Sequence, residues 1–382
     1  MCHQLRSIIT VEPVLFLFMT GTFLQAPAYQ QLILDKVCLE AYNDSICRNI
    51  QENNEEFRAV QSRGSYIMLI HIAIMSLMSI LPALILGAWS DMGSRRVGMI
   101  LPCVFSVASG ALYIVIYYVQ SMTVYWTFAS SALVGISGGH ISMFLSVFSY
   151  VADITESMNR TFRMGIAESM IFLGGTFGFL LSGILLEYST FTVVFGVYCG
   201  CNLFGALYVL IWLQESKPSN GYSRLSEECI DGDESEERTM LAKKSVTTYM
   251  KDSFSTIVKK REGQNRQKIL LILLCIFLIN LCNVGGVIQA PSGYTVAVLR
   301  SISSKIAYPN EQGAMFSIMA SVETICLLIA AAIFNGIYPA TLSSFPGMCF
   351  VIMAAFQIIT FVLIQWISEI PTELPKVIVN EE

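Results

Sequence analysis

Long apolar runs separated by polar stretches dominate the sequence and limit what the chain can fold into. A helix needs about 20 apolar residues to cross the hydrocarbon core of a bilayer. Only 13% of the residues are charged, against roughly 25% in soluble domains, so the composition is typical of a membrane protein. We predict an all-α polytopic membrane protein with nine spans, at residues 8–27, 66–88, 97–119, 124–150, 166–187, 190–213, 269–288, 314–337 and 346–367.

The polar segments divide and orient the chain. Residues 215–268 form the only long polar stretch of the sequence and follow the sixth apolar run. We therefore predict an N-terminal six-helix half (1–214), a cytosolic linker (215–268), an incomplete C-terminal half of about three helices (269–368) and a tail (369–382). The loop 28–64 is acidic, whereas the next loop carries Arg95 and Arg96. The positive-inside rule then places the amino terminus in the cytosol.

The loop 28–64 has two features that suit an extracellular or lumenal compartment. Asn43-Asp44-Ser45 is a glycosylation acceptor, so we predict a glycan on Asn43. Cys38 and Cys47 lie in the same loop, and an oxidising compartment could pair them. Most other cysteines lie in apolar runs without a zinc-type spacing, so no metal site is expected.

A charged cluster occupies the short turn between the second and third runs. Its spacing is G-x-x-x-D-x-x-x-R-R, from Gly87 through Asp91 to Arg95 and Arg96. A carboxylate four residues before a guanidinium can meet it across a tight turn in a charge-assisted contact. An ordinary positive-inside loop is the alternative. Asp153 and Arg163, between the fourth and fifth runs, are either a second ionic pair or two exposed loop charges.

Several stretches, in a fixed order, resemble one family of transporters. The turn spacing resembles the loop 2–3 signature of the major facilitator superfamily. The other stretches together resemble solute carrier family 46, the family of the proton-coupled folate transporter: Val11-Glu12-Pro13, Tyr150-Val151-Ala152-Asp153, Arg160-Thr161-Phe162-Arg163-Met164 with Glu168, Leu299-Arg300-Ser301, Glu311-Gln312-Gly313, and Phe334 to Thr341.

The resemblance implies a major facilitator helical bundle that performs secondary transport by alternating access. It implies a small organic anion as substrate, protons as coupling ion, no other cofactor, and a plasma, endosomal or lysosomal membrane. Membrane lipid is the expected surrounding, nucleic acid is not an expected partner, and a homo- or hetero-oligomer stays open. No H-E-x-x-H helix and no phosphate-cradling glycine loop occurs, so we do not expect an enzyme.

The resemblance also assigns roles to particular residues. Glu168 is expected to couple protons, because an acid desolvated in a helix can exchange a proton near working pH; an acid at a helix amino terminus is the alternative. His140 is either a proton relay or a helix–helix hydrogen bonder. Arg300 and Glu12 are expected to line the substrate site. Gating is assigned to the loop residues Gly87, Asp91, Arg95, Arg96, Asp153 and Arg163, with Asp91 expected to meet the start of the eleventh family helix, near residues 311–316.

The chain departs from the family in its second half. Family members have twelve spans, but here the eighth, the ninth and most of the tenth are absent after Gln289. About 14 residues, Ala290 to Ser303, would have to recross the membrane, and as a helix they reach only about 21 Å against about 30 Å of hydrocarbon. Either the last two spans invert, or this segment packs against protein or a water-filled cavity.

Two functional consequences follow from the departures. A chain that lacks part of one half could be a non-transporting regulator or partner of a full-length family member, which we keep as the alternative function. Folate transporters of the family carry an aspartate at the position of Ile136 and a histidine at the position of Asn283. Both differences argue against folate as the substrate.

Overall fold

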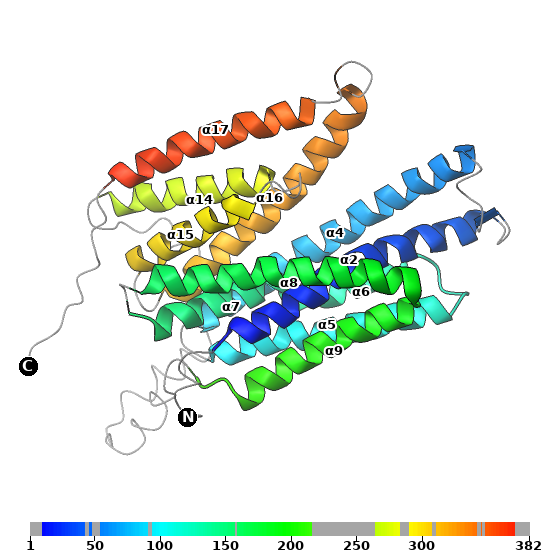
Figure 1. Ribbon diagram of the computed structural model, residues 1–382, viewed down its shortest axis with the longest axis horizontal. Coiled ribbons are helices and arrows are strands. Elements are labelled where there is room, and N and C mark those ends of the chain that lie inside the picture. The colour runs from blue at the N-terminus through cyan, green and yellow to red at the C-terminus, as the bar shows by residue number, and fades with distance from the viewer. Residues whose placement is uncertain are drawn as a thin grey trace, which may run out of the picture. The chain divides into compact units, whose positions relative to one another are not determined.

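The computed structural model is helical throughout the residues that it describes, which are 10–42, 46–47, 54–90, 94–156, 159–215, 264–282, 290–307, 311–341, 345 and 348–370. No strand occurs in these ranges, which confirms the predicted all-α class. The helices, labelled in Figure 1, are α2 (Glu12–Ala41), α4 (Asn54–Ser90), α5 (Arg95–Tyr118), α6 (Trp126–Ile136), α7 (Gly139–Ile154), α8 (Arg160–Tyr188), α9 (Phe191–Ile211), α14 (Asn265–Cys282), α15 (Ala290–Ile306), α16 (Gln312–Thr341) and α17 (Met348–Glu369).

Seven helical segments among the described residues are long and apolar enough to cross a membrane, with α6 and α7 counted as one segment. Residues 12–27 of the predicted span 8–27 lie in α2, and residues 269–282 of the predicted span 269–288 lie in α14; these two helices are not among the seven. The prediction of a polar loop at 28–64 is largely wrong, because α2 continues to Ala41 and α4 begins at Asn54. A helix can continue into water past the bilayer, so hydropathy alone does not mark its ends.

The described residues group into two compact units that interleave along the sequence. Unit 1 takes the residues up to Ile80, 99–143 and 166–213, and unit 2 takes 81–98, 144–165 and the residues from Gln214 onward. The boundaries fall inside α4, α5, α7 and α8. The division into two halves and a linker stays a prediction, and most of the linker lies outside the described residues.

Unit 1 is organised around α2. Leu24, Ala28 and Leu32 of α2 pack against aromatic and aliphatic residues of α5 and α9 in one buried cluster. On another side, α8 approaches α2 through a small-residue pair: a Cβ at Gly174 would lie 2.7 Å from the carbonyl oxygen of Phe16, and one at Gly178 would lie 2.5 Å from that of Thr20. Glycine at both positions is what allows the two helix backbones to approach so closely.

The predicted span 124–150 is interrupted between α6 and α7. Gly138 and Gly139 have φ angles of +77° and +49°, in the left-handed region that favours glycine. Gly135 to Gly139 also has the formal G-x-S-x-G spacing of a hydrolase nucleophile turn. Ser137 follows a helix, however, and its hydroxyl donates to the carbonyl of Val134. The strand–turn–helix setting that such a motif requires is therefore not found here.

In unit 2, helices α14 to α17 pack together (Figure 1). Cys326 and Ala330 of α16 form a small buried core with Phe277 of α14 and with residues of α17. The Lys268 ammonium donates to the carbonyl of Ile370 at 2.7 Å, so the start of α14 lies beside the end of α17. Gln312 is hydrogen bonded to Ser304, so α15 ends where α16 begins.

Helix α15 covers the segment that was expected from the sequence to recross the membrane. The 17 residues Ala290–Ile306 form a helix about 25 Å long, which packs against α14 and α16. Several of its polar side chains are buried: Arg300, Ser301, Ser303 and Ser304. The described residues of α15 thus pack against protein, and whether the last two spans invert stays a prediction.

The α6–α7 break generates a stability prediction. Gly138→Ala places a Cβ on a backbone with φ +77° and is expected to cost about 1–2 kcal/mol. Gly200→Ala is the matched control, because Gly200 is helical with nothing within 4 Å of a built Cβ, and it should be neutral or stabilising by up to about 1 kcal/mol. The melting temperature of the detergent-solubilised protein measures both. Equal effects of the two substitutions would contradict the strained geometry.

Candidate functional site

A buried ion pair joins the start of α5 to the end of α7 in unit 2. Arg95, at the start of α5, is 1% exposed, and its Nε donates to Oδ2 of Asp153 at 3.0 Å near the end of α7. A second guanidinium nitrogen, Nη1, donates to the Ser90 hydroxyl at 2.6 Å. The structure thus gives Asp153 the partner Arg95, whereas the expected pairing of Asp153 with Arg163 stays a prediction.

The end of α4 and the start of α5 lie close against the start of α16. A Cβ on Gly313 would lie 2.6 Å from Arg95 Nη1 and 2.7 Å from the Ser90 hydroxyl, and would overlap the Gly87 carbonyl oxygen. Gly87 is equally crowded by Ser317. The expected contact of Asp91 with residues 311–316 falls on a residue outside the described ranges, but its flanking residues reach that segment.

Two residues at the start of α8, Arg160 and Thr161, form hydrogen bonds with the C-terminal part of α15. Arg160 Nη1 donates to the backbone carbonyl and to the hydroxyl of Ser304, both at 3.3 Å, and its Nη2 donates to the carbonyl of Ala152 at 3.0 Å. Thr161 and Ser301 share a hydrogen bond of 2.8 Å. Arg160 was noted in the sequence only as part of a motif. Here it links α7, α8 and α15.

A second buried guanidinium lies deeper in unit 2. Arg300 of α15 is 3% exposed, and its Nη2 donates to Oε1 and Oε2 of Glu323 at 2.6 and 2.8 Å. Its Cζ lies 4.3 Å from the centre of the Phe148 ring and 5.6 Å from that of Phe144. Glu323 was missed at the sequence level. An acid in the middle of the apolar run 314–337 is itself the signal that would have found it.

Glu168 and Glu12 both lie in unit 1. Glu168 is 7% exposed and is the ninth residue of α8, so it lies two turns beyond the helix start, and its proton-coupling role stays a prediction. Glu12 is the first residue of α2 and accepts hydrogen bonds from the amide and the hydroxyl of Thr10, at 2.7 and 3.3 Å. Such contacts suit an acid at a helix amino terminus. Glu12 therefore has a local structural role, and its place in a substrate site stays a prediction.

The two histidines among the described residues of unit 1 lie in different surroundings. His140 is the second residue of α7, directly after the glycine break, and is half-buried. His71 of α4 is 3% exposed, shares a 2.7 Å hydrogen bond with the Tyr113 hydroxyl, and stacks on the Tyr29 ring at 4.7 Å between centroids. The helix–helix hydrogen bond thus accounts for one ring nitrogen of His71. The proton-relay role of His140 stays a prediction.

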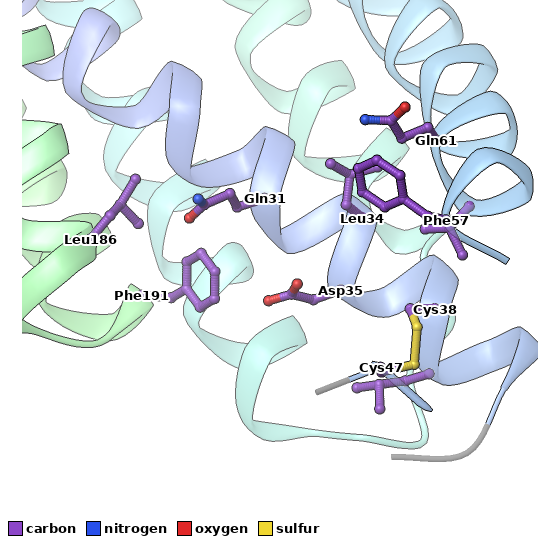
Figure 2. Close-up of a pocket in the computed structure, with 11 residues that line it drawn as sticks. Gln31, Leu34, Asp35, Cys38, Cys47, Phe57, Gln61, Leu186 and Phe191 are labelled. Carbon is purple, nitrogen blue, oxygen red and sulfur yellow. A yellow bond between two sulfur atoms is a disulfide. The ribbon is translucent and has the colours of Figure 1, made fainter. Parts of the chain in front are cut away.

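A pocket of about 570 Å³ lies in unit 1 beside a disulfide that joins Cys38 to Cys47 (Figure 2). Its walls come from α2, α4, the end of α8 and the start of α9, and are mostly apolar. The Asp35 side chain points into this space toward Phe191 (Figure 2). The apolar surroundings raise the pKa of the Asp35 carboxyl by desolvation. The predicted glycosylation site Asn43 lies outside the described residues.

Comparison with known proteins gives a consistent family. A profile described as "Major Facilitator Superfamily" matches residues 13–295. The lysosomal proton-coupled steroid conjugate and bile acid symporter SLC46A3 of Gallus gallus is 22% identical over 440 residues, covering 95% of this chain and 94% of the relative. The proton-coupled folate transporter of Rattus norvegicus is 24% identical over 418 residues, covering 93% of this chain and 91% of the relative.

A solved structure supports the fold. The crystal structure of the human organic anion transporter MFSD10 matches with a TM-score of 0.56 at 17% identity, covering 94% of this chain and 99% of that one. The 440-residue alignment with the SLC46A3 relative is longer than the whole 382-residue chain, so part of it falls in gaps of this chain. The predicted resemblance to solute carrier family 46 is confirmed by these relatives, and the chain belongs to the major facilitator superfamily.

Proposed function

We propose that this membrane transporter is a proton-coupled symporter of a small organic anion that works by alternating access. The burial of Arg300 among helices is the observation that carries the proposal. A guanidinium is always protonated. Because burying a charge away from water costs free energy, a buried charge in a membrane helix is a candidate functional group. Aromatic rings beside it (Phe144 and Phe148) and a planar set of donors suit an anion that also has an apolar body.

The relatives support this substrate class. One is named for steroid conjugates and bile acids, and a structural neighbour is named as an organic anion transporter. Another is named for folate, but Ile136 and Asn283 replace the residues that folate transporters of the family carry. We therefore propose bile acids or steroid conjugates ahead of folates.

Proton coupling is proposed to reside on Glu168. Its carboxyl is buried on α8, at the ninth residue of that helix, and a buried ionisable group in an apolar helix is a candidate functional group. Protonation would favour co-binding of an anion and the transition to the inward-facing state. An acidic outer or lysosomal compartment would then drive the anion toward the cytosol. His140 is the second proposed proton-handling residue.

The contacts around Arg95 support a gate. The Arg95–Asp153 pair and the close approach of Gly87 and Ser90 to Gly313 hold four helix ends together, those of α4, α5, α7 and α16. In alternating access, such contacts form in one state and release as the halves rock. We assign Arg96, Asp91 and Arg163 to the same gate from their positions in the two loops.

We also propose the topology and the setting of the protein. The Cys38–Cys47 disulfide supports an extracellular or lumenal position for the segment between α2 and α4, and with it a glycan on Asn43. The plasma membrane and the endosomal or lysosomal membrane both fit this orientation. The name of the SLC46A3 relative supports the lysosome.

A second candidate function is that of a non-transporting partner of a full-length family member. The gaps in the alignment with a relative of nearly complete coverage favour it, as do the three predicted helices that are absent. The test is co-purification of the chain with a full-length paralogue, together with uptake by the chain alone. Stable association without uptake favours the partner role, whereas uptake by the chain alone excludes a purely regulatory role.

The proton-coupling role is tested by Glu168→Gln. Uptake of labelled taurocholate and estrone sulfate is measured at pH 5.5 and 7.4 in cells that express the chain. We expect acid stimulation in the wild type to fall by roughly tenfold in the variant, because glutamine keeps the shape but cannot take up the proton. Glu187→Gln is the matched control, since Glu187 lies on the same helix but is exposed. Unchanged acid stimulation in Glu168→Gln would show that the coupling group lies elsewhere.

The gate is tested by Gly313→Ala. The added methyl would overlap the Gly87 carbonyl and crowd Arg95 and Ser90, so the contact between α4, α5 and α16 should loosen. We expect uptake to fall by about tenfold at both pH values, because conformational gating limits turnover, with the ratio between the two pH values unchanged. Gly183→Ala is the control, since nothing lies within 4 Å of a Cβ there. Equal uptake by the two variants would remove Gly313 from the gate.

A further inference from the structure

The pocket of unit 1 is walled by one face of α2 and one face of α4, beside the start of α9 (Figure 2). Gln31 and Asp35 lie four residues apart on α2, as Phe57 and Gln61 do on α4, and residues at this spacing share a helix face. Phe191, the first residue of α9, adds a further wall. The volume of about 570 Å³ falls within the roughly 300–1,000 Å³ of pockets that hold small organic ligands.

Asp35 is the ionisable group of this pocket. The other described lining residues are apolar side chains, amides and the two cysteines of the disulfide. The Asp35 side chain points into the space toward the Phe191 ring (Figure 2). In the part of the chain that the structure describes, no hydrogen bond or neighbouring charge offsets the desolvation that raises the pKa of this carboxyl. A carboxylate in such surroundings is stabilised when a cation enters beside it.

The cations on the helices around the pocket have partners of their own. The Lys36 ammonium donates to the carbonyls of Val119 and Met122, at 3.1 and 3.4 Å. Arg63 pairs with Glu40 at 3.2 Å. The other charged side chains that the structure describes near these helix ends are acids: Glu55, Glu56 and Glu187. The surroundings of the pocket therefore attract a positively charged ligand and repel an anion.

The walls determine which kind of cation fits. Phe57 and Phe191 supply aromatic rings, and such rings attract both apolar groups and cations. The amides of Gln31 and Gln61 carry carbonyl oxygens that accept a hydrogen bond from an N–H. A metal ion needs several hard ligands close together, and the described residues contain no group of three or more His, Cys, Asp or Glu that would hold one. The walls therefore match an ammonium group on an apolar body.

We propose that this pocket binds a lipophilic amine in its protonated form, with the ammonium on the Asp35 carboxylate and the apolar body against Phe57 and Phe191. The ligand is opposite in charge to the proposed transport substrate, so the inference goes beyond the proposed function. The occupant is a free amine. An amine headgroup of a phospholipid would bring its own phosphate close to Asp35, and the two like charges would repel each other.

The first test is binding of tritiated imipramine, a tertiary amine with an apolar ring system, to the full chain in phosphatidylcholine nanodiscs at pH 7.4. Asp35→Asn keeps the shape of the side chain and removes its charge. We expect its affinity to fall at least about tenfold, because a charge-assisted contact is lost. Glu187→Gln is the matched control, since Glu187 is an exposed acid that follows the lining residue Leu186 without lining the pocket itself. It should bind as the wild type does.

The second test uses the wild type alone and so does not depend on how well a variant folds. Decylamine, decanol and decanoate share one apolar chain and differ in the charge of the end group. We expect decylamine to displace imipramine at a concentration at least about tenfold lower than decanol does, and decanoate to be the weakest of the three. In parallel, imipramine should raise the melting temperature of the wild type more than that of Asp35→Asn.

The outcomes decide between the occupants. Equal imipramine affinity of the wild type and Asp35→Asn overturns the proposal, as does equal displacement by decylamine and decanol. Phosphatidylethanolamine added to the nanodisc should leave imipramine affinity unchanged. If it lowers the affinity of the wild type but not that of Asp35→Asn, the lipid headgroup occupies the pocket and the free amine is wrong. Because no transport is measured, failure of anion uptake would contradict the proposed function and not this site.

Discussion

A guanidinium removed from water must meet an opposite charge, and this requirement organises unit 2. Arg95 and Arg300 are 1% and 3% exposed. Each binds a carboxylate from a different helix, Asp153 on α7 and Glu323 on α16. Because stranding either charge would cost several kcal/mol, the two pairs fix how α5, α7, α15 and α16 can be placed. Because the two pairs hold these helices in place, a transport cycle can move the helices by breaking and re-forming the pairs.

Hydropathy was sufficient to predict the helices but not their ends or interruptions. The apolar runs correspond to helices because a chain in lipid must satisfy its own backbone hydrogen bonds. The continuation of α2 to Ala41 was not predictable from this rule, since its last turns follow the apolar run. The break at Gly138 and Gly139 was visible as a Gly-Gly pair. Its backbone angles, however, depend on the packing of α6 and α7 and not on hydropathy.

The candidate residues were easier to predict than their partners. Ionisable groups in apolar runs are few, so Glu168 could be found from its position, whereas Arg300 was found from the family resemblance. The partner of Asp153 could not, because Arg95 is 58 positions away and meets it only in the folded protein. Glu323 belongs to none of the motifs that carry the family resemblance. The cost of a charge inside an apolar run nevertheless indicates Glu323 as clearly as Glu168.

The polarity of α15 has a consequence for how the protein is made. Within 17 residues it carries Arg300, Lys305 and several serines, and insertion of an arginine at a helix centre is unfavourable by about 2.5–3.5 kcal/mol. Such a segment does not enter lipid by itself during synthesis. Glu323, which neutralises Arg300, is supplied by the next helix along the chain. We therefore expect the burial of α15 to become favourable only once α16, which carries Glu323, has emerged.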